Sequence, residues 1–191
     1  MIRYFTFTLT ALFLLASCAT VEETADDDNG EEGQDEMELA ETDLDVDEEL
    51  LPDWYSVEKR GEVINGTLYG YARSLGSDRD WAYENALRQA NSNLRIWIDQ
   101  QVEVARASLA EDNGAADERE FIIQLRNAVT TLEFEQAEVE STDFEDNDGA
   151  RHVVIKIELT SDDVLSELEE KLGAFSQVWN QMKEQEPLVD W

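Results

Sequence analysis

The sequence predicts a two-layer α+β domain, in which a small antiparallel sheet packs on one long helix and a further helix follows at the C-terminal end. Three observations predict this fold. Small residues alternate along a strand-like segment at 64–73, alanines recur at every fourth position of the next segment, and Asp148-Gly149 separates two strand-like runs. The small faces of the strand and the helix are complementary, which favours direct packing of one on the other.

The first strand is expected over Ile64 to Arg73. Its inward face is unusually small, and glycine inside a strand often marks the close approach of another element. Its outward face carries Tyr69, Tyr71 and Arg73, whose side-chain types are enriched at interfaces. We interpret these three residues as part of the core if the final helix covers them, and as a contact surface if it does not. The inward residues are Ile64, Gly66, Leu68, Gly70 and Ala72.

The long helix is predicted from Ser77 to about Ala107, with Asp78 and Asp80 as further signals of a helix start. Its apolar stripe begins with small residues and continues with larger ones, and charged residues occupy the opposite side. We expect the small residues at the start to lie against the glycine face of the strand. The stripe consists of Ala82, Ala86, Ala90, Leu94, Ile98 and Val102.

The remaining elements are predicted from the same two patterns, alternation for strands and three-to-four-residue spacing for helices. A second helix is expected over Asp117–Leu132, a strand over 132–144, a hairpin at Asp148-Gly149 and a return strand over 153–159. The final helix is expected from Ser161 to near Pro187. Its apolar stripe is short for a coiled coil, so packing on its own domain is the default and a subunit interface in a homo-oligomer is the alternative.

The N-terminal segment has the parts of a secretory signal. Arg3 precedes the apolar stretch Phe5–Leu15, which is too short to span a bilayer. The run Leu15-Ala16-Ser17-Cys18 closes this stretch and resembles the lipobox of bacterial lipoproteins. The resemblance implies cleavage before Cys18 and acylation of its sulfur and new amino group, by chains such as palmitate, which together give durable anchoring. The alternative is a free cysteine inside an ordinary signal segment.

The resemblance also bears on location. Ala19 follows the cysteine, whereas lipoproteins retained in the inner membrane carry an aspartate there. We therefore expect an outer-membrane lipoprotein that faces the periplasm, with surface exposure as the alternative.

An acidic leader separates this signal from the folded part. Residues 19–53 contain 17 acidic side chains and no basic one. Such a segment cannot bury enough apolar surface to offset the cost of ordering, so we expect a disordered tether. A divalent-cation site is the alternative, but the calcium-loop register set by Gly30 puts Ala25 where an aspartate is needed. The predicted division is thus 1–17 signal, 18–53 tether and 54–191 domain.

Composition restricts the chemistry of the domain. The formal net charge of −32 is repelled by nucleic acid and by anionic membrane surfaces. Cys18 is the only cysteine, so the domain has no thiolate metal site and no cysteine nucleophile. His152 is the only histidine and is expected to be solvated or internally satisfied. Recognisable phosphate-loop and hydrolase motifs do not occur, so we expect no enzyme, no catalytic residue, no cofactor and no metal.

Three segments resemble a known family. Pro52-Asp53-Trp54-Tyr55, which we interpret as a packing plug, is followed by Tyr69-Gly70-Tyr71-Ala72 and by the alanine-stepped helix. This pattern is similar to the "LPP twenty" family of small outer-membrane lipoproteins and to the N-terminal domain of the flagellar T-ring assembly protein. The resemblance implies a helix cradled by an antiparallel sheet on a lipidated N-terminus, with no catalytic activity. The acidic leader is longer than the family pattern implies.

These observations favour a lipoprotein that acts by contact with an envelope protein not identifiable from the sequence. A flagellar or envelope ring component is an alternative and requires self-association. A module that binds a glycan or lipid fragment is a second alternative and requires a cavity. A hydrolase with two carboxylates in a cleft is a third, although carboxylates are too abundant here to single out a pair.

Overall fold

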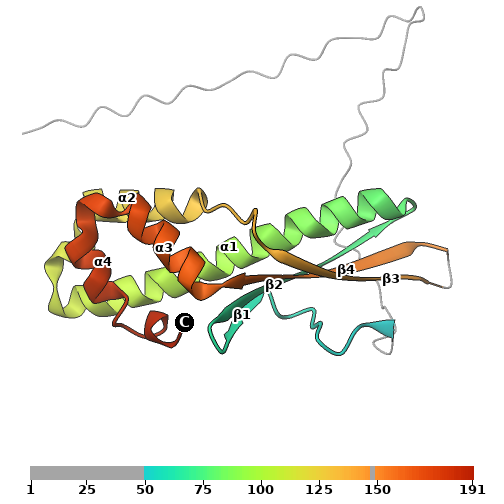
Figure 1. The fold of residues 1–191 in the computed structure, drawn as a ribbon, viewed down its shortest axis with the longest axis horizontal. Coiled ribbons are helices and arrows are strands. Elements are labelled where there is room, and N and C mark those ends of the chain that lie inside the picture. The colour runs from blue at the N-terminus through green and yellow to red at the C-terminus, as the bar shows by residue number, and fades with distance from the viewer. Residues whose placement is uncertain (1–49, 147–148) are drawn as a thin grey trace, which may run out of the picture. The chain divides into compact units, whose positions relative to one another are not determined.

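The structure is a computed structural model that describes residues 50–146 and 149–191 (Figure 1). It confirms the α+β class: a four-stranded antiparallel sheet is joined to the long helix α1, Arg79–Asp112, and to shorter helices near the C-terminal end. The predicted signal peptide 1–17, its lipobox Leu15–Cys18 and the tether up to residue 49 lie outside the described residues.

The sheet has the strand order β1-β2-β4-β3. The long strands β2, Thr67–Gly76, and β4, Arg151–Thr160, pair along their full lengths at its centre. The shorter strands β1, Gly61–Ile64, and β3, Glu138–Glu145, form the two edges. The two central strands carry most of the inward-facing apolar side chains, as their burial patterns show.

The prediction of one strand over 64–73 is wrong. A hairpin turn at Asn65-Gly66 divides that segment into β1 and β2. Asn65 and Gly66 have φ values of 51° and 78°, the left-handed pair that a type I′ turn requires. Gly66 therefore lies in the turn and not on the helix-facing side. Gly61 takes that role in β1, directly opposite Gly70 of β2.

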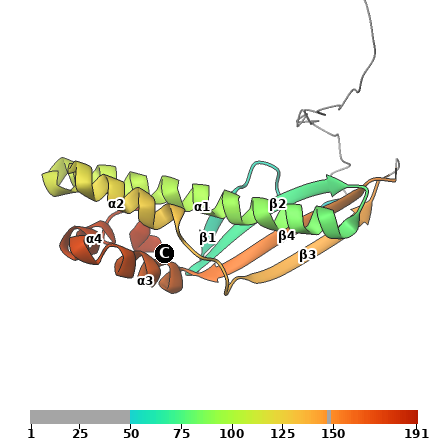
Figure 2. The same cartoon turned by 90° about the horizontal axis from the view of Figure 1, so that it is seen from above.

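The first half of α1 covers one face of the sheet, as both views show (Figures 1 and 2). Asp78 caps the helix by accepting a 2.8 Å hydrogen bond from the Trp81 backbone N–H. A Cβ atom on Gly70 would lie 2.7 Å from the Leu94 Cβ and 3.0 Å from the Ala90 carbonyl oxygen. The predicted fit of a small strand face to a small helix face is confirmed. The whole predicted stripe is buried: Ala82, Ala86, Ala90, Leu94, Ile98 and Val102.

The second half of α1 extends beyond the sheet and packs on other helices (Figure 1). These are a 3-10 turn at Gly114–Asp117, α2, Arg119–Thr130, and α4, Ser176–Met182. The predicted second helix is therefore confirmed with a shorter extent. The predicted strand over 132–144 begins later, at β3, because the preceding residues connect α2 to the sheet. The core here is built from large side chains: Phe121, Leu125, Leu168, Trp179 and Met182.

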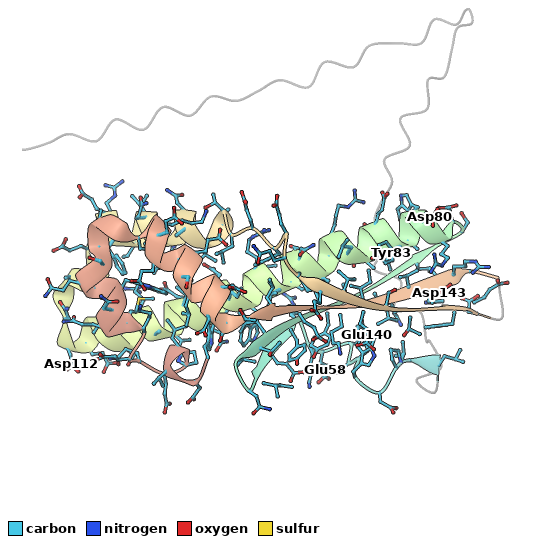
Figure 3. All side chains as sticks on the ribbon, viewed as in Figure 1. Glu58, Asp80, Tyr83, Asp112, Glu140 and Asp143 are labelled. Atoms are coloured by element: carbon cyan, nitrogen blue, oxygen red, sulfur yellow. The ribbon has the colours of Figure 1, made fainter. Side chains whose placement is uncertain are left out.

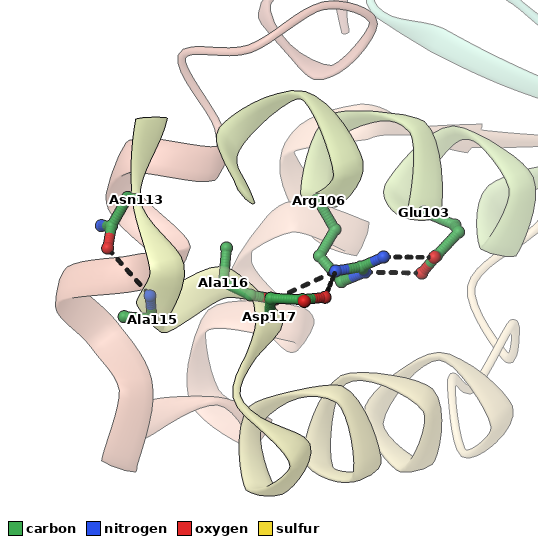
Figure 4. Close-up of polar contacts among 6 residues, drawn as sticks. All are labelled: Glu103, Arg106, Asn113, Ala115, Ala116 and Asp117. Carbon is green, nitrogen blue, oxygen red and sulfur yellow. Dashed lines mark hydrogen bonds and ion pairs between the residues drawn. The ribbon is translucent and has the colours of Figure 1, made fainter. Parts of the chain in front are cut away.

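Arg106 ties α1 to the turn that follows it (Figure 4). Its guanidinium donates to both carboxylate oxygens of Glu103, at 2.9 and 2.7 Å, and to Asp117 at 3.0 Å. It also donates to the Ala116 carbonyl oxygen at 3.2 Å. The bidentate bond to Glu103 is the main cause that raises the pKa of Arg106, and it lowers the pKa of Glu103. The cluster fixes the reversal between α1 and α2.

The prediction of one final helix is also wrong. The segment forms α3, Ser161–Lys171, and then α4, with a 3-10 turn at Gly173–Phe175 between them. Thr160 caps α3 by accepting a hydrogen bond from the Asp163 N–H. The predicted apolar stripe nevertheless faces its own domain, because Leu168, Leu172, Trp179 and Met182 are all buried.

Candidate functional site

The face of the sheet opposite α1, here called the outer face, carries the three residues predicted as a contact surface. Tyr71 stacks on Tyr69 with ring centroids 6.5 Å apart, and Trp54 also stacks on Tyr71, at 6.3 Å. Trp54 belongs to residues Leu50–Arg60, here called the strap, which precede β1. The strap therefore adds an aromatic layer to the outer face.

The strap buries the three predicted contact residues to different extents. Tyr71 is 3% exposed, and Tyr69 and Arg73 are half-buried. The cover comes from the strap and not from the final helix, whose position was to decide between a core and a contact surface. The sequence held one signal of this arrangement, the interpretation of Trp54-Tyr55 as a packing plug.

Lys156 of β4 lies in the middle of this aromatic layer. Its Nζ atom is 5.4 Å from the Trp54 ring centroid and 5.6 Å from that of Tyr69, which are cation–π distances. It also pairs with Glu140 at 2.7 Å and with Glu158 at 3.0 Å. The hydrogen bond to Glu140 is the largest cause that raises the pKa of Lys156. Figure 3 shows Glu140 on the strap side of the sheet.

A second polar contact joins β1 to the aromatic layer. The Tyr71 hydroxyl donates a 2.6 Å hydrogen bond to Glu62, which also pairs with Lys59 of the strap at 3.0 Å. Burial, followed by this hydrogen bond, raises the pKa of Tyr71 well above its ordinary value. Burial alone would raise the pKa of Glu62, but the hydrogen bonds from Tyr71 and Lys59 outweigh it and lower that pKa. The contact connects the strap, β1 and β2.

His152 lies on the same face and is used structurally. Its side chain is 1% exposed, its ring stacks on Phe144 at a centroid distance of 4.8 Å, and its Nε2 lies 2.9 Å from Asp146 Oδ2. The side chain is therefore buried and not solvated, and its Nε2 atom has an internal partner. Its Nδ1 is also buried, and within 50–146 and 149–191 no hydrogen-bond partner reaches it.

Sequence reasoning missed a groove between α3 and the segment that leads into β3. Two adjoining cavities of about 630 and 250 Å³ form it, and half of the residues that line them are acidic, with Lys171, Leu159 and Val164 among the others. We call it the acidic groove. Carboxylates occur throughout this sequence, so no pattern in the chain could single these out. Its acidic residues are Glu133, Glu135, Glu138, Glu158, Asp163, Glu167 and Glu170.

Within 50–146 and 149–191, no group of three or more His, Cys, Asp or Glu side chains is arranged to hold a metal ion. None of the helices in these ranges has the length and apolar character needed to cross a membrane.

The geometry defines a class of domain: a long helix on one face of a four-stranded antiparallel sheet, with the chain's own strap on the other face. Comparison with protein-family models, with curated proteins and with solved structures found no match for this chain.

Proposed function

We propose that this chain is a bacterial lipoprotein, anchored in the outer membrane through Cys18, whose domain acts by protein–protein contact in the periplasm. The observation that carries the proposal is the run Leu15-Ala16-Ser17-Cys18 at the end of a short apolar stretch, in a chain with no other cysteine. In this proposal, the acidic residues 19–49 are a tether that lets the domain contact partners at a distance from the membrane. The resemblance to the "LPP twenty" family supports the same location.

The polar clusters of the domain support a contact role over a catalytic one. His152 is enclosed and stacked on Phe144, and Arg106 is bound in a fork by Glu103 and Asp117. Lys156 is held between two aromatic rings and two carboxylates. Each of these groups is engaged in stabilising the fold, so the surfaces of the domain are its best candidates for function.

The anchor is tested by Cys18→Ala in cells that produce the full chain. Wild type is expected to incorporate a palmitate label and to fractionate with the outer membrane. Cys18→Ala is expected to lose the label and the outer-membrane fractionation, because the alanine has no sulfur to acylate. Ser17→Ala is the matched control, since it keeps both the cysteine and a small residue before it. A Cys18→Ala protein that stays labelled and in the outer membrane contradicts the proposal.

The contact role is tested by crosslinking in intact cells, followed by identification of the proteins bound to the domain. A reproducible envelope partner is expected. Sedimentation of the full chain separates this role from ring assembly, which requires a self-associated species. A strict monomer with no crosslinked partner contradicts both.

A further inference from the structure

Strand β3 forms one edge of the sheet. Among the residues that the structure describes, it pairs with β4 alone and lies at the border of the sheet, as Figure 2 shows. The Asp146 N–H donates to the Ala150 carbonyl oxygen at 2.9 Å, and bonded pairs recur at every second residue of an antiparallel ladder. Even-numbered residues of β3 therefore bond to β4, and odd-numbered ones direct their N–H and C=O groups away from it. These exposed residues are Val139, Ser141, Asp143 and Glu145.

The edge is long enough for a second strand. It has eight residues, against four in β1 at the opposite edge of the sheet. Val139, at 42% exposure, offers an apolar contact beside the free backbone groups. Unpaired edges of this length are templates for pairing with another chain.

Charge restricts which chain can pair there. The strand carries four carboxylates, of which Glu140, Asp143 and Glu145 already pair with basic side chains of this chain. The uncompensated negative charge lies at the N-terminal end of the strand, where Glu138 also lines the acidic groove. A second copy of β3 would bring the same charges, and residues 19–49 are also acidic, so both are repelled. The carboxylates are Glu138, Glu140, Asp143 and Glu145.

We propose that the β3 edge binds an extended, lysine- or arginine-rich segment of a partner protein by strand addition. The main-chain groups of β3 provide the pairing, and Glu138 with the carboxylates of the acidic groove provides the preference for a basic partner. At the end of the added strand, the acidic groove accepts one more basic side chain above Leu159 and Val164. This inference deepens the proposed contact function and rests on it by naming the class of partner.

Hydrogen exchange of the full chain tests the pairing directly. The probe is an eight-residue peptide of alternating lysine and threonine, and the control peptide replaces every lysine with glutamate. The lysine peptide at saturation is expected to slow exchange at least tenfold at the outward amides of β3, with weaker binding at higher salt because exposed charges are screened. Strand β1, the other edge, is the internal control and is expected to stay unchanged.

Two variants separate strand addition from general charge attraction. Ser141→Pro removes an outward N–H and keeps the ladder to β4, so it is expected to fold and to lose the protection. Ser141→Ala keeps the backbone donor and is expected to behave as wild type. Equal protection by both peptides, unchanged binding of Ser141→Pro, or the absence of any protection overturns the inference. If the wild-type protein is not acylated at Cys18 but still binds the lysine peptide, the proposed location is wrong and the strand-addition inference stands.

Discussion

The sheet buries side chains on both of its faces, but different kinds of contact close them. On the helix face, Gly70 lets the Ala90 backbone and Leu94 approach to distances that leave no room for a Cβ atom. On the outer face, Trp54 and Tyr71 stack with ring centroids 6.3 Å apart, and Lys156 lies over the Trp54 ring. The first closure is a tight backbone approach along a long helix, and the second is a short segment held by a few rings and ion pairs.

The difference predicts how each face responds to change. A tight small-residue interface has no space to relax, so adding atoms is costly and removing them is of little consequence. In an aromatic cover, removing atoms is the costly change, because most of the stabilisation comes from a few large side chains. The helix face should therefore be sensitive to enlargement and the outer face to truncation.

Gly70→Ala should give the largest effect. The added methyl group meets the Leu94 Cβ at 2.7 Å and the Ala90 carbonyl oxygen at 3.0 Å, so α1 must shift along its contact with the sheet. We expect a loss of about 3 kcal/mol in the free energy of unfolding, measured by urea denaturation. Gly173→Ala is the control, since its Cβ would have no described atom within 4 Å, and should change stability by less than about 0.5 kcal/mol. Equal effects at the two positions would remove the distinction between the faces.

Trp54→Ala should give the next largest effect. It removes the ring that stacks on Tyr71 and lies near Lys156, at a half-buried position. We expect a loss of about 2 kcal/mol in the free energy of unfolding and increased binding of a hydrophobic dye to the opened face. Val57→Ala, in the same strap at 67% exposure, should change neither measurement appreciably. If Trp54→Ala binds no more dye than Val57→Ala, the strap does not close the outer face.

Tyr71→Phe should give the smallest effect, about 1 kcal/mol at pH 7, through loss of the 2.6 Å hydrogen bond to Glu62. Because the pKa of Glu62 is lowered in the folded state, its contribution is present above its unfolded pKa, about 4.3, and is lost as the pH falls through the folded pKa. The stability difference between wild type and Tyr71→Phe should therefore shrink in acid.

The same variant has a second pH window. The folded pKa of Tyr71 is raised, so wild type should lose stability relative to Tyr71→Phe as the pH rises above about 10, the unfolded value. Urea midpoints of both proteins at pH 3, 7 and 10.5 check both windows. A difference that is the same at all three values would show that the contribution of the Tyr71 hydroxyl is not linked to the titration of Glu62 or of Tyr71.

The helix face could be predicted because its signals are local. The stripe from Ala82 to Val102 has the period of a helix, and Gly70 alternates with tyrosines in a strand. Strand β1 was missed because four residues carry little periodicity, although Asn65-Gly66 is a strong hairpin signal. The cover over Tyr71 depends on the path of the strap across several strands, and the acidic groove depends on tertiary placement of common residues. Neither is encoded in a local pattern.

The strap also has a mechanical consequence. Any pull transmitted through the chain ahead of Leu50 reaches Pro52 and Trp54 before it reaches a strand of the sheet. The stacked ring is then the first contact to yield, and the ten residues from Leu51 to Arg60 can extend by about 3.3–3.6 Å each before β1 is put under tension. The strap therefore detaches from the outer face before the sheet is loaded. The β2–β4 ladder experiences force only after the strap has detached.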